Sequence, residues 1–271
     1  MLLSLAAGQA VAAPITFTAA GGSAAAIQAT VDSFRAALGT LNPNTAGSFG
    51  TGRREINWDG VPNSSAAPNA HAGNFFNTNS PRGVVLSTPG SGFQVSATAA
   101  SGIPVDFGNI NPSYPALFNA FSAERLFTAI GSNITDVSFF VPGTTTPALS
   151  RGFGAVFADV DIANITGITL FDIDNASLGT FFAPATNGNG TFSFVGALFN
   201  EPLIAHVRIT SGTGALGGND VGQGVDLVVM DDFIFGEPVA ALAAAVPAPG
   251  FAPVLLAGAL LPVLRRRRRP D

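Results

Sequence analysis

Three pairs of aspartates are the side chains whose type and spacing are best suited to chemistry. The pairs are Asp159 and Asp161, Asp172 and Asp174, and Asp231 and Asp232. In the first two pairs the residues alternate, so both carboxylates point to one face if the strand continues. Carboxylates at strand ends are the hard oxygen ligands that Ca²⁺ prefers, which makes calcium a candidate cofactor. Aspartates that end strands also form Asx turns without binding anything, and this interpretation stays open.

A second candidate site surrounds the single tryptophan of the chain. Arg53, Trp58 and Asp59 lie in the segment 52–60, which places an aromatic face beside charged and amide groups. β-Sandwiches often hold sugar rings with such a combination, so these three residues are candidate ligand contacts. The indole can also fill the core above a turn at residues 57–60, and with only one tryptophan available for stacking the sequence favours the core.

Catalysis by histidine has little support in the sequence. The chain has two histidines, His71 in a polar loop and His206 on the polar face of a predicted strand. A Gly-x-Ser-x-Gly elbow and a His-Glu-x-x-His motif are both absent. We therefore expect a protein that is not an enzyme, and the alternative is a secreted carbohydrate-active hydrolase with paired carboxylates. Those carboxylates would come from Asp159, Asp161, Asp231 or Asp232.

Composition restricts the class of partner. The chain contains no cysteine, so an exported protein of this size must be stabilised by its core rather than by disulfides. All 12 basic residues are arginine, and five of them close the chain together with Asp271, which leaves the rest with a charge of about −9. Nucleic-acid binding is disfavoured because phosphate contacts need positive charge. The acidic balance is compatible with cation binding and, equally, with solubility alone.

The elements that position these side chains are predicted to be mostly strands. The chain has 23 phenylalanines and many glycines, and short apolar runs bounded by turn residues indicate an all-β antiparallel sandwich. The predicted strands are 83–87, 92–97, 136–141, 154–160, 167–172, 179–183, 191–198, 204–210, 225–229 and 232–235. Residues 64–81 are predicted to form a long surface loop, and residues 13–238 to form one domain.

One amphipathic helix is predicted before the strands. Its apolar residues recur at spacings of four, three and four, and they are Ile27, Val31, Phe34 and Leu38. Ser23 is suited to the N-cap and Gly39 to the C-terminal end. We expect the apolar face of this helix to pack against the sandwich.

Both ends of the chain predict export. Residues 1–12 resemble the end of a signal peptide, with the small-residue pattern Ala10-Val11-Ala12 before a mature start at Ala13. Residues 239–249 form an Ala/Pro linker that ends in a Pro-x-Pro motif. Residues 250–271 combine an apolar helix, long enough to enter a bilayer, with the cytoplasmic basic cluster Arg265, Arg266, Arg267, Arg268 and Arg269.

This C-terminal order of motif, apolar helix and basic cluster resembles the PEP-CTERM sorting signal of Gram-negative bacteria. The motif residues are Val246, Pro247, Ala248, Pro249 and Gly250. Ala248 stands where the family usually has glutamate. The resemblance implies processing by signal peptidase and an exosortase, an inner-membrane intermediate, and release to the cell envelope or the exterior.

The body also resembles a group of exported bacterial proteins. The segments that carry the likeness are 52–60, 75–83, 152–161 and 230–236. The resemblance implies a jelly-roll-like sandwich and supplies no chemistry. The sequence thus predicts a non-catalytic protein of the surface or extracellular matrix, whose partners are exopolysaccharide or other surface proteins.

Overall fold

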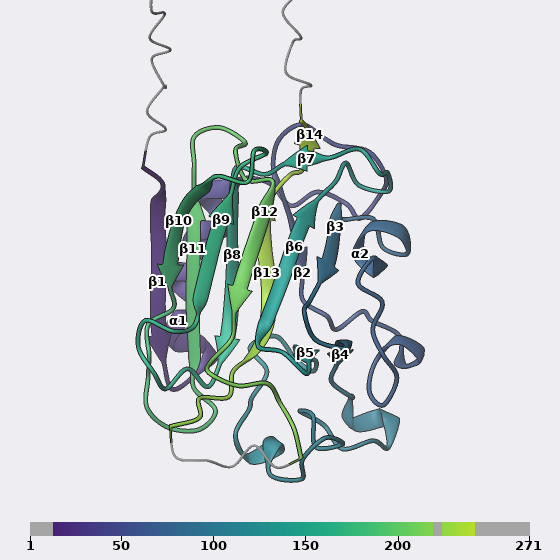
Figure 1. Ribbon diagram of the computed structural model, residues 1–271, viewed down its shortest axis with the longest axis vertical. Coiled ribbons are helices and arrows are strands. Elements are labelled where there is room, and N and C mark those ends of the chain that lie inside the picture. The colour runs from purple at the N-terminus through teal and green to yellow at the C-terminus, as the bar shows by residue number, and fades with distance from the viewer. Residues whose placement is uncertain (1–12, 219–223, 242–271) are drawn as a thin grey trace, which may run out of the picture. The chain divides into compact units, whose positions relative to one another are not determined.

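The computed structural model describes residues 13–218 and 224–241 and consists mainly of antiparallel β-sheets (Figure 1). The predicted signal peptide, the sorting motif and the predicted membrane helix with its arginines lie outside these residues. Among the described helices, none has the length and apolar character needed to span a membrane.

Two large sheets contain most of the strands. The seven-stranded sheet has the order β1 (Ile15–Gly21), β11 (Phe192–Leu198), β8 (Gly152–Ala158), β13 (Val229–Gly236), β5 (Phe127–Ile130) and β4 (Gly92–Val95), with β2 (Arg53–Ile56) also paired to β13. The five-stranded sheet has the order β10 (Ser177–Phe182), β9 (Gly167–Phe171), β12 (His206–Thr210), β6 (Ile134–Phe139) and β3 (Val84–Ser87). A short pair joins β14 (Val239–Ala240) to β7 (Ala148–Leu149).

The main core lies between the two large sheets. Phe153, Phe157 and Phe233 of the larger sheet belong to one buried cluster with Val137 and Val207 of the smaller sheet. Alternation along each strand sends one set of side chains inward, as a sandwich requires. The predicted all-β architecture, with two antiparallel sheets packed on a shared core, is confirmed.

Helix α1 (Ala24–Leu38) covers the outer face of the larger sheet. The predicted apolar stripe is confirmed, because all four of its residues are buried against β8, β11 and β13. The Phe34 ring packs directly on backbone: a Cβ added to Gly154 or Gly196 would lie 2.8 or 3.0 Å from it. These two glycines face each other in the β8–β11 register, so they let the helix approach closely.

Several predicted boundaries were wrong. The structure adds a second, one-turn helix, α2 (Phe75–Thr78), within a segment predicted to be a loop. Strands β1, β2 and β5 were not predicted, because β1 is rich in Thr and Ala, β2 carries three charges and β5 is only four residues long. The strand predicted at 225–229 is absent. Instead β13 begins at Val229 and continues through Asp231 and Asp232 into the strand that was predicted at 232–235.

Candidate functional site

Asp231 and Asp232 lie at a β-bulge within β13. Met230 pairs with Phe157 and Phe233 pairs with Ala155, so two aspartates oppose a single residue of β8. The bulge lets both carboxylates lie on the α1 side of the sheet while their neighbours stay in the core. On the other edge of β13, pairing passes from β2 to β5 at the same point, so loops from both strands reach the bulge.

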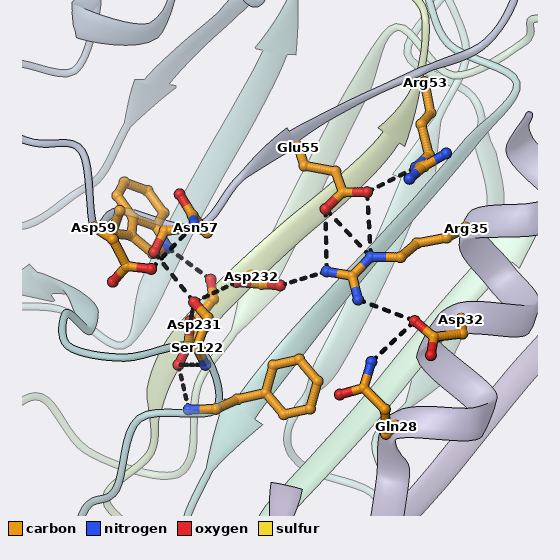
Figure 2. Close-up of polar contacts among 12 residues, drawn as sticks. Gln28, Asp32, Arg35, Arg53, Glu55, Asn57, Asp59, Ser122, Asp231 and Asp232 are labelled. Carbon is orange, nitrogen blue, oxygen red and sulfur yellow. Dashed lines mark hydrogen bonds and ion pairs between the residues drawn. The ribbon is translucent and has the colours of Figure 1, made fainter. Parts of the chain in front are cut away.

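Arg35 of α1 joins the bulge to the helix (Figure 2). Its Nη2 lies 2.7 Å from Asp232 Oδ2 and 3.0 Å from Glu55 Oε2, and its Nη1 lies 3.2 Å from Asp32 Oδ1. Arg53 Nε adds a 2.6 Å contact to Glu55 Oε1. The network therefore ties α1 to β2 and β13, and each of its guanidinium groups faces a carboxylate.

The aspartate pair is buried and shares hydrogen bonds. Ser122 Oγ lies 2.9 Å from Asp232 Oδ1 and 3.1 Å from Asp231 Oδ1, and Phe121 N donates to Asp231 Oδ2 at 2.6 Å. Burial, followed by repulsion from Asp232, raises the pKa of Asp231 well above its ordinary value. Burial also raises the pKa of Asp232, opposed by Ser122 and Arg35. At 0% and 1% exposure these carboxylates cannot reach a substrate.

A second acidic group lies where β8 ends. Asp159 follows the strand with φ of 70°, and its Oδ1 is buried without a hydrogen-bond partner among the described residues. Asp226 accepts hydrogen bonds from the backbone N–H groups of Asp161 and Ile162, each at 3.2 Å. Burial and, secondarily, the charges of Asp161 and Asp226 raise the pKa of Asp159 to about 7.

The third pair forms a turn. Asp172 Oδ1 accepts the backbone N–H groups of Asp174 at 3.0 Å and Ala176 at 2.8 Å, which makes an Asx turn between β9 and β10. Within residues 13–218 and 224–241, no group of three or more histidine, aspartate or glutamate side chains is arranged to hold a metal ion. The six candidate calcium ligands are therefore divided between three locations rather than gathered at one.

Trp58 is a core residue. It is 1% exposed, its ring stacks on Phe127 with centroids 4.0 Å apart, and its Nε1 donates to Asp231 O at 2.6 Å. Its φ of 65° lies in the left-handed region, which a bulky residue adopts only under strong constraint from its surroundings. Of the two interpretations that the sequence left open, the structure favours the core.

A cleft of about 220 Å³ nevertheless opens beside the indole. Its lining residues come from the segment after β2 and from α2 with the residues that follow it. They are Asn57, Trp58, Gly60, Val61, Phe75, Phe76, Asn79, Ser80 and Arg82. Aromatic rings, two amides and one guanidinium thus surround a small space that contains no carboxylate in its lining.

The two other predicted ligand contacts lie outside this lining. Asp59 accepts the backbone N–H of Arg125 at 3.1 Å and the amide of Asn57 at 3.0 Å. Arg53 faces Glu55 in the network around Arg35. Sequence reasoning missed the part of the cleft that α2 provides, although its segment 75–83 carries two aromatic residues, two asparagines and an arginine close together.

The two histidines lie in different environments. His71 was expected to be exposed but is buried, with its Nδ1 3.1 Å from Ser65 O and its ring centroid 5.0 Å from that of Phe75. Burial lowers the pKa of His71. His206 lies on the polar side of β12 as predicted, with its Nε2 3.1 Å from Asp136 Oδ1.

Comparison of the chain with protein-family models, curated proteins and solved structures finds no match.

Proposed function

We propose that residues 13–241 form an exported, non-catalytic binding domain that holds a carbohydrate in the cleft beside Trp58. The main support for this proposal is the set of side chains that line the cleft. Phe75 is partly exposed and offers an apolar face, while the amides of Asn57 and Asn79 can exchange hydrogen bonds with hydroxyl groups. At about 220 Å³ the space is smaller than a typical drug-sized pocket, so a single sugar ring of a longer chain fits it best.

The positions of the acids support a non-catalytic role. A glycosidase needs two carboxyl groups roughly 5 to 10 Å apart across its cleft. Asp231 and Asp232 instead share the Ser122 hydroxyl and are covered by α1 and the 121–122 segment. Asp159, Asp161 and Asp226 lie together after β8, and the pKa of Asp159 is raised to about 7, but none of these acids lines the cleft. Release of reducing ends from a polysaccharide would support the hydrolase alternative.

The proposed export to the cell envelope or the exterior is based on the sequence patterns at the two ends of the chain. We keep the exosortase-processed route, with a transient inner-membrane intermediate, and the jelly-roll-like description of the sandwich as parts of the proposal. Partners would be exopolysaccharide or other proteins of the surface. Mass spectrometry of the mature protein tests the route: cleavage near Val246–Gly250 supports it, and a mature protein that retains Arg265–Arg269 contradicts it.

Binding is tested with purified residues 13–241, which contain every described helix and strand. A glycan array should identify at least one bound carbohydrate, and Asn79→Ala should weaken that binding because Asn79 is exposed at the cleft. Thr180→Ala changes an exposed residue of β10 in the other sheet and serves as the control. Binding to no glycan, or equal binding by both variants, would favour a protein partner.

A further inference from the structure

Arg82 is the charged residue of the cleft. Its Nη1 donates to Ser80 Oγ, and its Nε is buried without a hydrogen-bond partner among the described residues. The guanidinium lies over the Phe76 ring, 4.9 Å from the centroid. Neither an ion pair nor a hydrogen bond to a carbonyl engages this guanidinium in the part of the chain that the structure describes. Most of its five N–H donors therefore remain for a ligand.

Each of the other described arginines donates to a carboxylate or to a backbone carbonyl. Arg54 shows the contrast best, because it pairs with Glu237 through Nε at 2.8 Å and Nη2 at 2.9 Å and also donates to the carbonyls of Thr45, Gly47 and Pro81. Arg125 and Arg151 donate to the carbonyls of Ser96 and Ala37. Glu237 is thus committed to Arg54 and does not neutralise Arg82.

The result is a local positive charge in a protein of net charge −5. Burial, and then repulsion from Arg54, lowers the pKa of Arg82 to about 10, so the guanidinium stays protonated at neutral pH. Burying a cation without a counter-ion is unfavourable, and an ion pair with an anionic group of a ligand would offset this cost. The planar fork of arginine is suited to a carboxylate, which it can contact through two parallel hydrogen bonds.

We propose that the cleft selects carboxylated sugars, with Arg82 binding the carboxylate of a uronic acid residue. This inference rests on the proposed carbohydrate-binding function and names the ligand class of the same cleft. The sugar ring would lie near Phe75, and the amides of Asn57 and Asn79 would face its hydroxyl groups. Neutral sugars lack the group that Arg82 needs, so they would bind weakly.

The test uses the intrinsic fluorescence of residues 13–241. Trp58 is the single tryptophan and lines the cleft, so its emission reports occupancy directly. The probes are oligogalacturonate, oligoglucuronate and oligomannuronate, each compared with the neutral oligosaccharide of the same backbone sugar. We expect at least one uronate to bind and its neutral counterpart to bind at least tenfold more weakly, as the loss of a charge-assisted contact implies.

Matched variants assign the effect to Arg82. Arg82→Gln should weaken uronate binding about ten- to a hundredfold. Arg208→Gln removes the same charge from an exposed residue of β12 that pairs with Asp136, so it should bind like the wild type. Arg82→Lys keeps the charge without the planar fork and should lie between the two. It also supplies a folded comparison if the glutamine variant is unstable.

Each outcome separates the two proposals. Equal binding of neutral and acidic oligomers overturns the role of Arg82 and leaves the carbohydrate site intact. Binding of neither class overturns both. Acetate or sulfate that competes as strongly as the uronates indicates a site for small anions only, and it also overturns the inference.

Discussion

At the scale of single residues, Trp58 connects the core to the cleft. One face of the indole stacks on Phe127 of β5, its Nε1 holds the carbonyl of Asp231 at the bulge, and its edge meets Phe76 beside the cleft. The ring therefore borders the cleft and supports the bulge at the same time. If the cleft binds sugar as proposed, the residue type at this position affects both stability and binding.

Trp58→Phe should lower the free energy of unfolding by about 2 to 3 kcal/mol, because it leaves a cavity and an unpaired buried carbonyl. Urea denaturation followed by circular dichroism measures the loss, since the variant has no tryptophan signal. Phe182→Leu, on the exposed side of β10, is the control and should change the value by less than about 0.5 kcal/mol. Equal stabilities of the two variants would show that the indole is not part of the core.

Asp159→Asn should make the domain less sensitive to alkaline pH. The folded-state pKa of Asp159, about 7, lies above the unfolded value near 4, so its stabilising contribution is present below pH 4 and is lost as pH rises through 7. Since solvent partly screens this carboxylate, we expect the variant to gain on the order of 1 to 2 kcal/mol at pH 8 relative to pH 4. This prediction would be refuted if the free energy of unfolding in urea depended on pH in the same way for Asp159→Asn and the wild type. Asp174→Asn, in the exposed Asx turn, is the control.

At the scale of elements, apolar packing and the ion pairs of Arg35 together determine how α1 docks on the larger sheet. Apolar packing places the helix on β8, β11 and β13, and Arg35 fixes it to Glu55 and Asp232 from two strands. The spacing of Ile27, Val31, Phe34 and Leu38 is enough to predict this helix and its buried face. It cannot predict the partners of Arg35, because these come from segments 20 and 197 residues away.

The bulge shows why part of the site could not be predicted. Two adjacent aspartates interrupt an apolar run, and a regular strand would have to send one of them into the core. The pattern therefore indicated two strands with a break. The bulge instead places both on the α1 side, at a point where Arg35 and Ser122 compensate them. Only the three-dimensional pairing reveals that compensation.

Arg35→Ala should destabilise the domain by about 2 to 4 kcal/mol, because it leaves the buried Asp232 without a cation and leaves Glu55 with Arg53 alone. Asp32→Ala removes the exposed partner of the same guanidinium and should cost less than about 1 kcal/mol. Guanidinium chloride would screen ion pairs, so urea is the appropriate denaturant. A larger effect for Asp32 than for Arg35 would contradict the proposed order of contributions.

At the scale of the described domain, one core serves both sheets. Residues of the seven-stranded and five-stranded sheets belong to the same buried cluster, and residues 13–218 and 224–241 belong to one compact unit. Composition and strand patterning predict this sandwich well. They cannot place the cleft, because it is formed by α2 and the segment after β2, which meet only in the fold.

A single core predicts a single unfolding transition for residues 13–241. Circular dichroism, which reports all strands, and Trp58 fluorescence, which reports one part of the core, should give coincident urea curves. Two separated transitions would mean that the sheets unfold independently, contrary to the shared core.

The most direct test of the account is nuclear magnetic resonance of ¹⁵N-labelled residues 13–241 titrated with the uronate oligomer that binds best. The shifts should concentrate on Asn57, Phe75, Asn79 and the Arg82 side chain, and the sugar should gain no new reducing-end signals, because the account predicts binding without hydrolysis. Shifts centred on Asp231 and Asp232, or the appearance of new reducing-end signals, would contradict a non-catalytic sugar-binding cleft.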